Sequence, residues 1–383
     1  MMDLDAWLAK TKLVVCVGSG GVGKTTTAAA IGLRGALKGR KAIVLTIDPA
    51  KRLANSLGLD AMGGEPTRID LSALPDAGGE LWAMMLDSRG TFDALIANVS
   101  PSPEARDRIL KNHIYRNMAD AFAGSQDYMA TEKLYDLASA GRWDLVVLDT
   151  PPVKNALDFL ESPGKVVTFL DERILSWFLA PYERKNVWGG RLLAGTSAFM
   201  FKLLGYVFGK EFLDDLAEFL QDFRGLYDGF RHRHQAVMSM MRATDTSFVT
   251  VCAPNESSID VARFFQVELA KRDLPRAGVV VNQVHRCDAA DDDANAALGA
   301  AVARLSTDLP PATAATLLAR LGRAHVRLRA LVEAEHALAG SLRAAAKGGG
   351  FYQEVPRIEG EVHDLTSLRA VGEYLFGAPA EEA

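Results

Sequence analysis

Nine consecutive residues near the amino terminus constrain the fold of this chain more than any other feature. They read Gly-Ser-Gly-Gly-Val-Gly-Lys-Thr-Thr and fit the Walker A pattern G-x-x-x-x-G-K-[S/T]. The apolar run Leu13–Val17 precedes them, and an alanine-rich stretch of helical character follows. Because the pattern requires a strand before the loop and a helix after it, the sequence predicts a phosphate-binding loop in an α/β domain.

This loop carries the groups that bind a nucleoside triphosphate. Its glycines allow main-chain N–H groups to point at phosphate oxygens, and the helix amino terminus adds about half a positive charge. Lys24 is expected to neutralise the β- and γ-phosphates during catalysis, and Thr25 is expected to bind Mg²⁺. The predicted nucleotide contacts are Gly18, Ser19, Gly20, Gly21, Val22, Gly23, Lys24, Thr25 and Thr26.

Short apolar runs bounded by glycine, proline or aspartate recur along the 383 residues. Their continuity, without polar alternation, predicts strands that helices cover on both faces. The sequence therefore predicts an α/β fold, a doubly wound and mostly parallel sheet of the P-loop NTPase type. The expected strands are Leu13–Val17, Ala42–Ile47, Leu81–Leu86, Leu145–Leu148, Phe248–Cys252 and Val279–Val281.

The distance between the fourth and fifth of these strands, about a hundred residues, is far more than one crossover helix needs. Residues 165–244 carry large apolar side chains at helical spacing, so we predict an inserted helical subdomain, with residues 92–140 packed beside it. The P-loop core would then comprise residues 1–91, 141–164 and 245–383. Within that core, Ala312–Ala346 is expected to form an amphipathic helix or a helical hairpin.

The run Leu192–Gly209 has one charged residue, Lys202, in 18 residues, which is the lower edge of membrane-spanning length. Internal glycines and a charged flank argue against insertion, so we expect a protein that is not integral to the membrane. Two interpretations stay open. The run is either a helix buried against its neighbours or a partly exposed apolar helix that contacts a client or partner.

Composition excludes several classes of protein. The formal net charge of −5 gives no basic footprint for a polyanion, so nucleic acid is not an expected partner. The amino terminus carries acids where a secretory signal needs basic residues, which favours a cytoplasmic location.

Cysteine and histidine do not indicate a metal site. The three cysteines, Cys16, Cys252 and Cys287, are too far apart in sequence for a CxxC pair, which argues against a disulfide scaffold, a four-cysteine zinc site or an iron–sulfur cluster. His232 and His234 are two residues apart on a predicted helix, so they cannot converge on one ion and are expected to be surface residues.

Two aspartates complete the predicted site. Asp149 ends an apolar run, where the carboxyl end of a parallel strand meets the ligand crevice, and is expected to bind Mg²⁺ directly or through another ligand. Asp48 ends another run, on the expected γ-phosphate side, where a carboxylate can orient or deprotonate the attacking water. Alone, either residue would more often be a helix cap or turn residue. The predicted metal-binding set is Thr25, Asp48 and Asp149.

The order of these motifs resembles the ArsA-type anion-transporting ATPases and their relatives that guide tail-anchored proteins, a family of MinD/ParA-like P-loop ATPases. The resembling blocks are residues 18–26, 46–50, 149–152, 280–283 and 355–365. The resemblance implies that Asp48 is catalytic, that Asn282 reads adenine and that Pro356 flanks the adenine ring. It also implies a dimer whose switch regions, after Asp48 and Asp149, respond to the nucleotide.

Base preference can be argued separately from the residues. Guanine-specific P-loop proteins use an N-K-x-D loop whose carboxylate accepts hydrogen bonds from the ring, whereas this chain reads Asn282-Gln283-Val284-His285. With no acid at the fourth position, ATP is favoured over GTP.

Three departures from the family pattern bear on activity. Ser19 replaces a lysine that, in the family, reaches the partner's nucleotide. We expect one of three consequences: hydrolysis is slow, it uses Lys51, Arg52 or Lys154 instead, or it depends on a paralogous partner that carries the lysine. The CxxC that joins targeting ATPases through zinc is missing, so a dimer must rest on packing. No cysteine triad is present for arsenite, which prefers thiolates.

Three hypotheses follow. The leading one is a Mg²⁺-dependent ATPase, a homodimer or a heterodimer with a paralogue, whose helical insertion binds an apolar protein segment or a membrane-protein client. The second is the energising subunit of an anion or metalloid pump. The third is a structural partner that binds ATP with little turnover.

Overall fold

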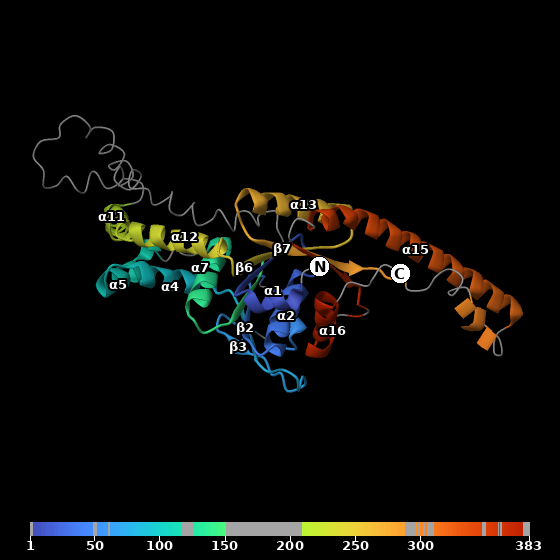
Figure 1. The fold of residues 1–383 in the computed structure, drawn as a ribbon. Coiled ribbons are helices and arrows are strands. Elements are labelled where there is room, and N and C mark those ends of the chain that lie inside the picture. The colour runs from blue at the N-terminus through green and yellow to red at the C-terminus, as the bar shows by residue number, and fades with distance from the viewer. Residues whose placement is uncertain are drawn as a thin grey trace, which may run out of the picture.

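The computed structural model confirms the predicted α/β architecture. An eight-stranded sheet runs through the described part of the chain in the order β3-β4-β2-β5-β1-β6-β7-β8, and its strands are parallel except for the pair β3 and β4. Helices cover both faces (Figure 1). The structure describes residues 3–48, 52–59, 62–115, 126–150, 209–287, 310–346, 350–358, 360 and 362–377, and scattered positions between 296 and 304.

All six predicted strands are present, with small differences at their ends. They are β1 (Leu13–Val17), β2 (Lys41–Thr46), β4 (Glu80–Met85), β5 (Leu145–Asp149), β6 (Thr246–Cys252) and β7 (Arg276–Val284). The sequence patterns do not reveal the two edge strands, β3 (Thr67–Arg68) and β8 (Phe351–Pro356). Buried and half-buried residues alternate along β8, whereas the prediction relied on continuous apolar runs.

The central strands are apolar throughout because both of their faces are buried. In β1, Val14 and Cys16 belong to one core, whereas Leu13, Val15 and Val17 belong to the core on the opposite face. The first core is covered by α1 (Leu4–Lys10), α2 (Lys24–Leu37), α3 (Arg52–Ser56) and α16 (Leu365–Phe376), and the second by α7 (Gln126–Ser139), α12 (Tyr227–Met241) and α13 (Glu256–Lys271).

A helical region lies to one side of the sheet and has its own apolar cluster (Figure 1). It is built from α4 (Ser88–Val99), α5 (Pro103–Lys111), α7, α11 (Lys210–Arg224) and α12. Aromatic side chains dominate its interior, including Phe92, Tyr115, Phe219, Phe223 and Phe230. Because α7 and α12 also contribute to the sheet core, the helical region and the sheet share two helices. The subdomain boundaries given above stay a prediction.

An ion network joins these two shared helices. Arg233 on α12 donates from Nε to Glu132 on α7, at 2.6 Å, and its Nη2 pairs with Asp136 one turn further on. Glu132 is fully buried, and desolvation raises the pKa of its carboxyl although Arg233 opposes that effect. The network therefore neutralises a charge that burial alone would penalise.

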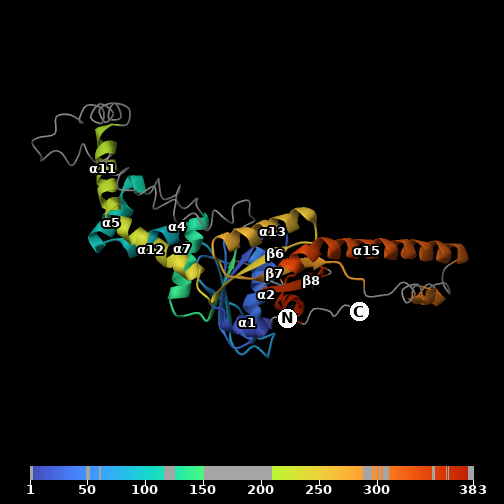
Figure 2. The same ribbon diagram turned by 45° about the horizontal axis from the view of Figure 1, so that its top comes forward.

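Residues 311–346 form one helix, α15 (Pro311–Ala346), and not a hairpin. Its carboxyl-terminal part packs against the sheet through Ala339 and Leu342, while its amino-terminal part projects beyond the sheet (Figure 2). Exposed apolar side chains along α15 are Leu318, Leu321, Val326 and Leu331.

The apolar run Leu192–Gly209 lies, except for Gly209, outside the described residues, so neither interpretation of it is tested. In the ranges that the structure covers, no helix combines the length and apolarity required to cross a bilayer.

One histidine corrects an expectation. His232 is exposed as predicted, but the ring of His234 is half-buried, and its buried Nδ1 has no hydrogen-bond partner among the described residues. Burial lowers the pKa of His234. The spacing along the helix could not show this, because how much of the ring is covered depends on what packs around α12.

Candidate functional site

Strand register brings the predicted site residues together at the carboxyl ends of the central strands. Asp149 at the end of β5 lies opposite Cys16 in β1 and Thr46 in β2. The glycine loop follows β1, and Asp48 follows β2. The loop and both aspartates therefore meet at the carboxyl ends of three neighbouring strands, as predicted for a ligand crevice in a parallel sheet.

Two glycines of the loop are required by close contacts. Gly18 and Gly23 both have positive φ, 155° and 89°. A Cβ at Gly18 would clash with the main-chain carbonyl of Val251, and one at Gly23 would clash with the side chain of Asn282. Glycine is therefore needed at both positions, at the start of the loop and directly before α2.

The amino terminus of α2 presents a positive end to the crevice. Its cap residue is Gly23, and no side chain in the described chain caps the first turn, which contains no acid. Lys24 is buried, and its Nζ donates to the main-chain oxygen of Ser19 at 2.8 Å. Desolvation lowers the pKa of the Lys24 amine, so this site gains by acquiring an anion.

Asp149 is held by two threonine hydroxyls. Its Oδ2 accepts from Thr25 Oγ1 at 2.7 Å and from Thr46 Oγ1 at 2.9 Å, while its buried Oδ1 has no partner among the described residues. Burial raises the pKa of this carboxyl to about 6, and both hydroxyls oppose the shift. A buried carboxylate oxygen without a partner, next to a threonine hydroxyl, fits the oxygen ligands that Mg²⁺ prefers.

The raised pKa of Asp149 predicts a pH dependence of stability. A carboxyl with a pKa above its value in the unfolded chain destabilises the fold once it ionises, so stability should fall as pH rises from about 4 to about 6. Relative to Asp149→Asn, which cannot ionise, the ligand-free wild type should lose about 2 kcal/mol of unfolding free energy between pH 4.5 and 7. Urea unfolding across this range measures the difference, and a difference independent of pH would contradict the burial of this charge.

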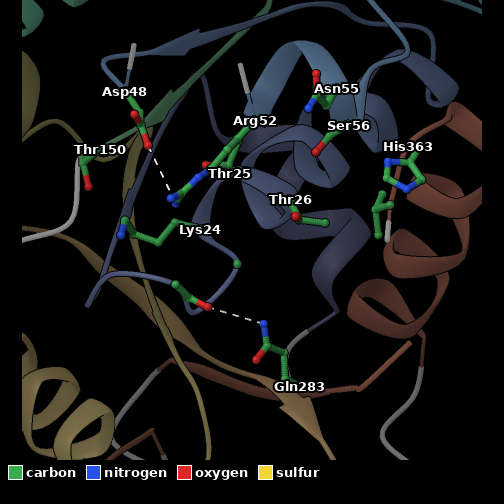
Figure 3. A pocket seen from close by; sticks show the side chains of 13 residues that line it. Lys24, Thr25, Thr26, Asp48, Arg52, Asn55, Ser56, Thr150, Gln283 and His363 are labelled. Atoms are coloured by element: carbon green, nitrogen blue, oxygen red, sulfur yellow. Dashed lines mark hydrogen bonds and ion pairs between the residues drawn. The ribbon is translucent and has the colours of Figure 1, made fainter. Parts of the chain in front are cut away.

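A cavity of about 320 Å³ opens in front of these groups (Figure 3). Lys24, Thr25 and Thr26 line it from α2, Asp48 lines it from the segment after β2, and Arg52 lines it from the start of α3. Asp48 is half-buried, its main-chain N–H donates to Thr46 Oγ1 at 3.2 Å, and its Oδ2 lies 3.9 Å from Arg52 Nη1. The size and the lining of the cavity suit a polyphosphate.

A second cavity, of about 840 Å³, adjoins the first along the end of β7. Asn282 and Pro356, the two residues expected at adenine, both line it. The side-chain amide of Asn282 donates to Val22 O of the phosphate loop at 2.8 Å. Gln283, with φ of 63°, lies at the irregularity between β7 and β8 and lines both cavities. The adenine-binding roles remain a prediction.

The side chain of Ser19 contacts α13. Its hydroxyl lies 2.9 Å from that of Ser258 on α13, and it does not line the phosphate cavity. Sequence reasoning missed this contact and the role of Thr46, because both depend on which strands and helices are adjacent. No motif placed His363 in the cavity, and the sequence named Arg52 only as one of three alternative cations.

The described ranges contain no group of three or more histidine, cysteine or acidic side chains arranged to hold a metal ion.

Comparison with known proteins extends the similarity over most of the chain. The family model for anion-transporting ATPases matches residues 11–298. Protein Rv2184c of Mycobacterium tuberculosis is 31% identical over 164 residues, which cover 41% of this chain and 38% of that protein. The ATPase ASNA1 homolog of Plasmodium berghei is 25% identical over 272 residues, 70% of this chain and 61% of that protein. ATPase GET3C of Arabidopsis thaliana is 26% identical over 288 residues, 70% and 65% of the two chains. This chain thus spans between 38% and 65% of the length of these relatives.

Proposed function

The chain belongs to the anion-transporting ATPase family, and from this premise we propose that it binds ATP with Mg²⁺ and hydrolyses it. One observation carries the proposal: Lys24, Thr25 and Asp48 line a single cavity, and Asp149 is hydrogen-bonded to Thr25 at its edge. These are the cation, the hydroxyl and the carboxylates that phosphoryl transfer from a nucleotide requires.

Each of these residues has a separate role in the proposed reaction. The loop N–H groups and Lys24 hold the phosphates, while Thr25 and Asp149 would hold Mg²⁺, which supplies charge to the β- and γ-phosphates when bound. Asp48 orients the attacking water and accepts its proton as the new bond to the γ-phosphorus forms. The bond from that phosphorus to the β–γ bridging oxygen breaks, so ADP and inorganic phosphate leave.

Replacing Lys24 by alanine tests the binding step. Loss of a charge-assisted contact to phosphate should weaken MgATP binding about 10- to 100-fold, as measured by calorimetry. Lys12→Ala is the matched control, because Lys12 is an exposed lysine at the opposite end of β1, paired with Asp245. Unchanged MgATP affinity in Lys24→Ala would contradict the assignment of the loop.

We extend the proposal to a switch. Asp149 ends β5, and β5 follows α7 of the helical region along the chain. Contacts with the γ-phosphate would be transmitted through this connection to the helical region, where an apolar protein segment would bind, and to a second protomer or a paralogue.

A second candidate function is a structural partner with low turnover. It is favoured by the contact between Ser19 and Ser258, which holds the residue-19 side chain away from the phosphate cavity. Phosphate release with Asp48→Asn in this chain, measured in the presence of an active paralogue, separates the two functions. Unchanged release would favour the low-turnover partner, because this chain would then contribute no turnover of its own.

A further inference from the structure

We propose that Arg52 is a catalytic residue that contacts the transferred γ-phosphoryl group from within the same chain. The inference rests on the proposed ATPase function and deepens it by assigning the second positive charge of the site. Phosphoryl transfer spreads negative charge over the equatorial oxygens of the γ-phosphate, and P-loop enzymes commonly stabilise it with an arginine, supplied in cis or in trans.

The lining of the phosphate cavity supports this assignment. Of the described residues that line this cavity, Lys24 is the one lysine and Arg52 is the one arginine. Lys24 lies at the loop, where the β- and γ-phosphates are expected, and the guanidinium of Arg52 lies beside Asp48 (Figure 3). A γ-phosphate bound between the loop and Asp48 would therefore have both cations in the same cavity.

The side chain of Arg52 has the freedom that such a contact needs. Its side chain is 63% exposed, and its 3.9 Å separation from Asp48 is too long for a hydrogen bond. In Figure 3 the guanidinium points into the cavity, toward Asp48. An exposed i,i+4 ion pair of this kind contributes little free energy. A phosphate offers the guanidinium more charge and two acceptors in fork geometry, so replacing the contact with Asp48 by one with phosphate is favourable.

Lys24 and Arg52 line the same phosphate cavity, and two like charges in one cavity are stabilised when an anion enters it. The hydroxyl of Ser19, by contrast, lies against Ser258.

The test compares the ground state with a mimic of the transition state. Arg52→Ala should bind MgATP within about threefold of wild type, yet bind Mg·ADP·aluminium fluoride at least about 100-fold more weakly and lose a similar factor in kcat. Arg52→Lys should recover only part of the loss, because an ammonium lacks the planar fork. Arg369→Ala is the control, since Arg369 forms an exposed i,i+4 pair with Glu373, outside both cavities, and should match wild type.

The outcomes separate this inference from the function on which it rests. If the wild type binds no MgATP, the proposed function fails. If the wild type binds MgATP but Arg52→Ala binds the aluminium fluoride complex as tightly as wild type does, only the role of Arg52 fails. An equal loss for MgATP and for the mimic would also overturn it, because Arg52 would then contribute to general nucleotide binding and not to the transition state.

Discussion

Replacing Asp48 by asparagine should lower kcat about 100- to 10,000-fold and leave the Kd for MgATP within about threefold of wild type. Asparagine keeps the size of the side chain but cannot accept the proton of the attacking water. Asp48 lines the same cavity as Lys24 but belongs to the segment after β2, so the substitution removes a carboxylate from the cavity and no group from the loop. Single-turnover phosphate release and calorimetry measure the two effects.

Asp245→Asn is the matched control for this experiment. Asp245 precedes β6 at the opposite edge of the sheet and pairs with Lys12 on the surface, so its loss should change neither quantity. Unchanged kcat in Asp48→Asn would remove Asp48 from its catalytic role. A large loss of MgATP affinity would instead assign it to binding, as a metal ligand.

Replacing Arg233 by alanine should destabilise the protein by about 3–5 kcal/mol. Arg233 neutralises Glu132, whose side chain is 1% exposed and whose Oε1 already has no hydrogen-bond partner among the described residues. The substitution leaves a buried carboxylate without its counter-ion, in the interface between α7 and α12. Urea unfolding followed by circular dichroism measures the loss.

Two further variants make this prediction specific. Arg108→Ala removes an equally well-formed pair, with Asp222, but Arg108 is 51% exposed, so the cost should stay below about 1 kcal/mol. Adding Glu132→Gln to Arg233→Ala should recover much of the stability, because the buried charge is then gone. If the double variant is no more stable than Arg233→Ala, the loss comes from packing, for example against Tyr135, and not from the unpaired carboxylate.

Local patterns were sufficient for much of the fold. The six continuous apolar runs correspond to β1, β2, β4, β5, β6 and β7, because strands buried on both faces need apolar residues at every position. The edge strand β8 escaped prediction, since it pairs with β7 alone and alternates in burial. The sequence of Ala312–Ala346 was compatible with one helix or a helical hairpin, because helical periodicity does not show where a helix ends without a breaking residue.

The sequence predicted those site residues that can be recognised from their residue type and their position next to a strand. Lys24, Thr25, Asp48 and Asp149 follow apolar runs, so their meeting at one edge follows from parallel strands alone. The partners of these residues did not follow. Ser258 is 239 residues from Ser19, and Thr46 is 103 residues from Asp149.

The amino-acid sequence by itself determined the phosphate loop, the six strands with continuous apolar runs and the two aspartates, because each is specified by neighbours along the chain. Only the tertiary structure decided that Ser19 turns toward α13, that Arg52 lies beside the phosphate cavity and that the carboxyl of Asp149 is buried with one oxygen unpartnered. These features depend on strand order and helix packing, which bring together residues that no local pattern relates.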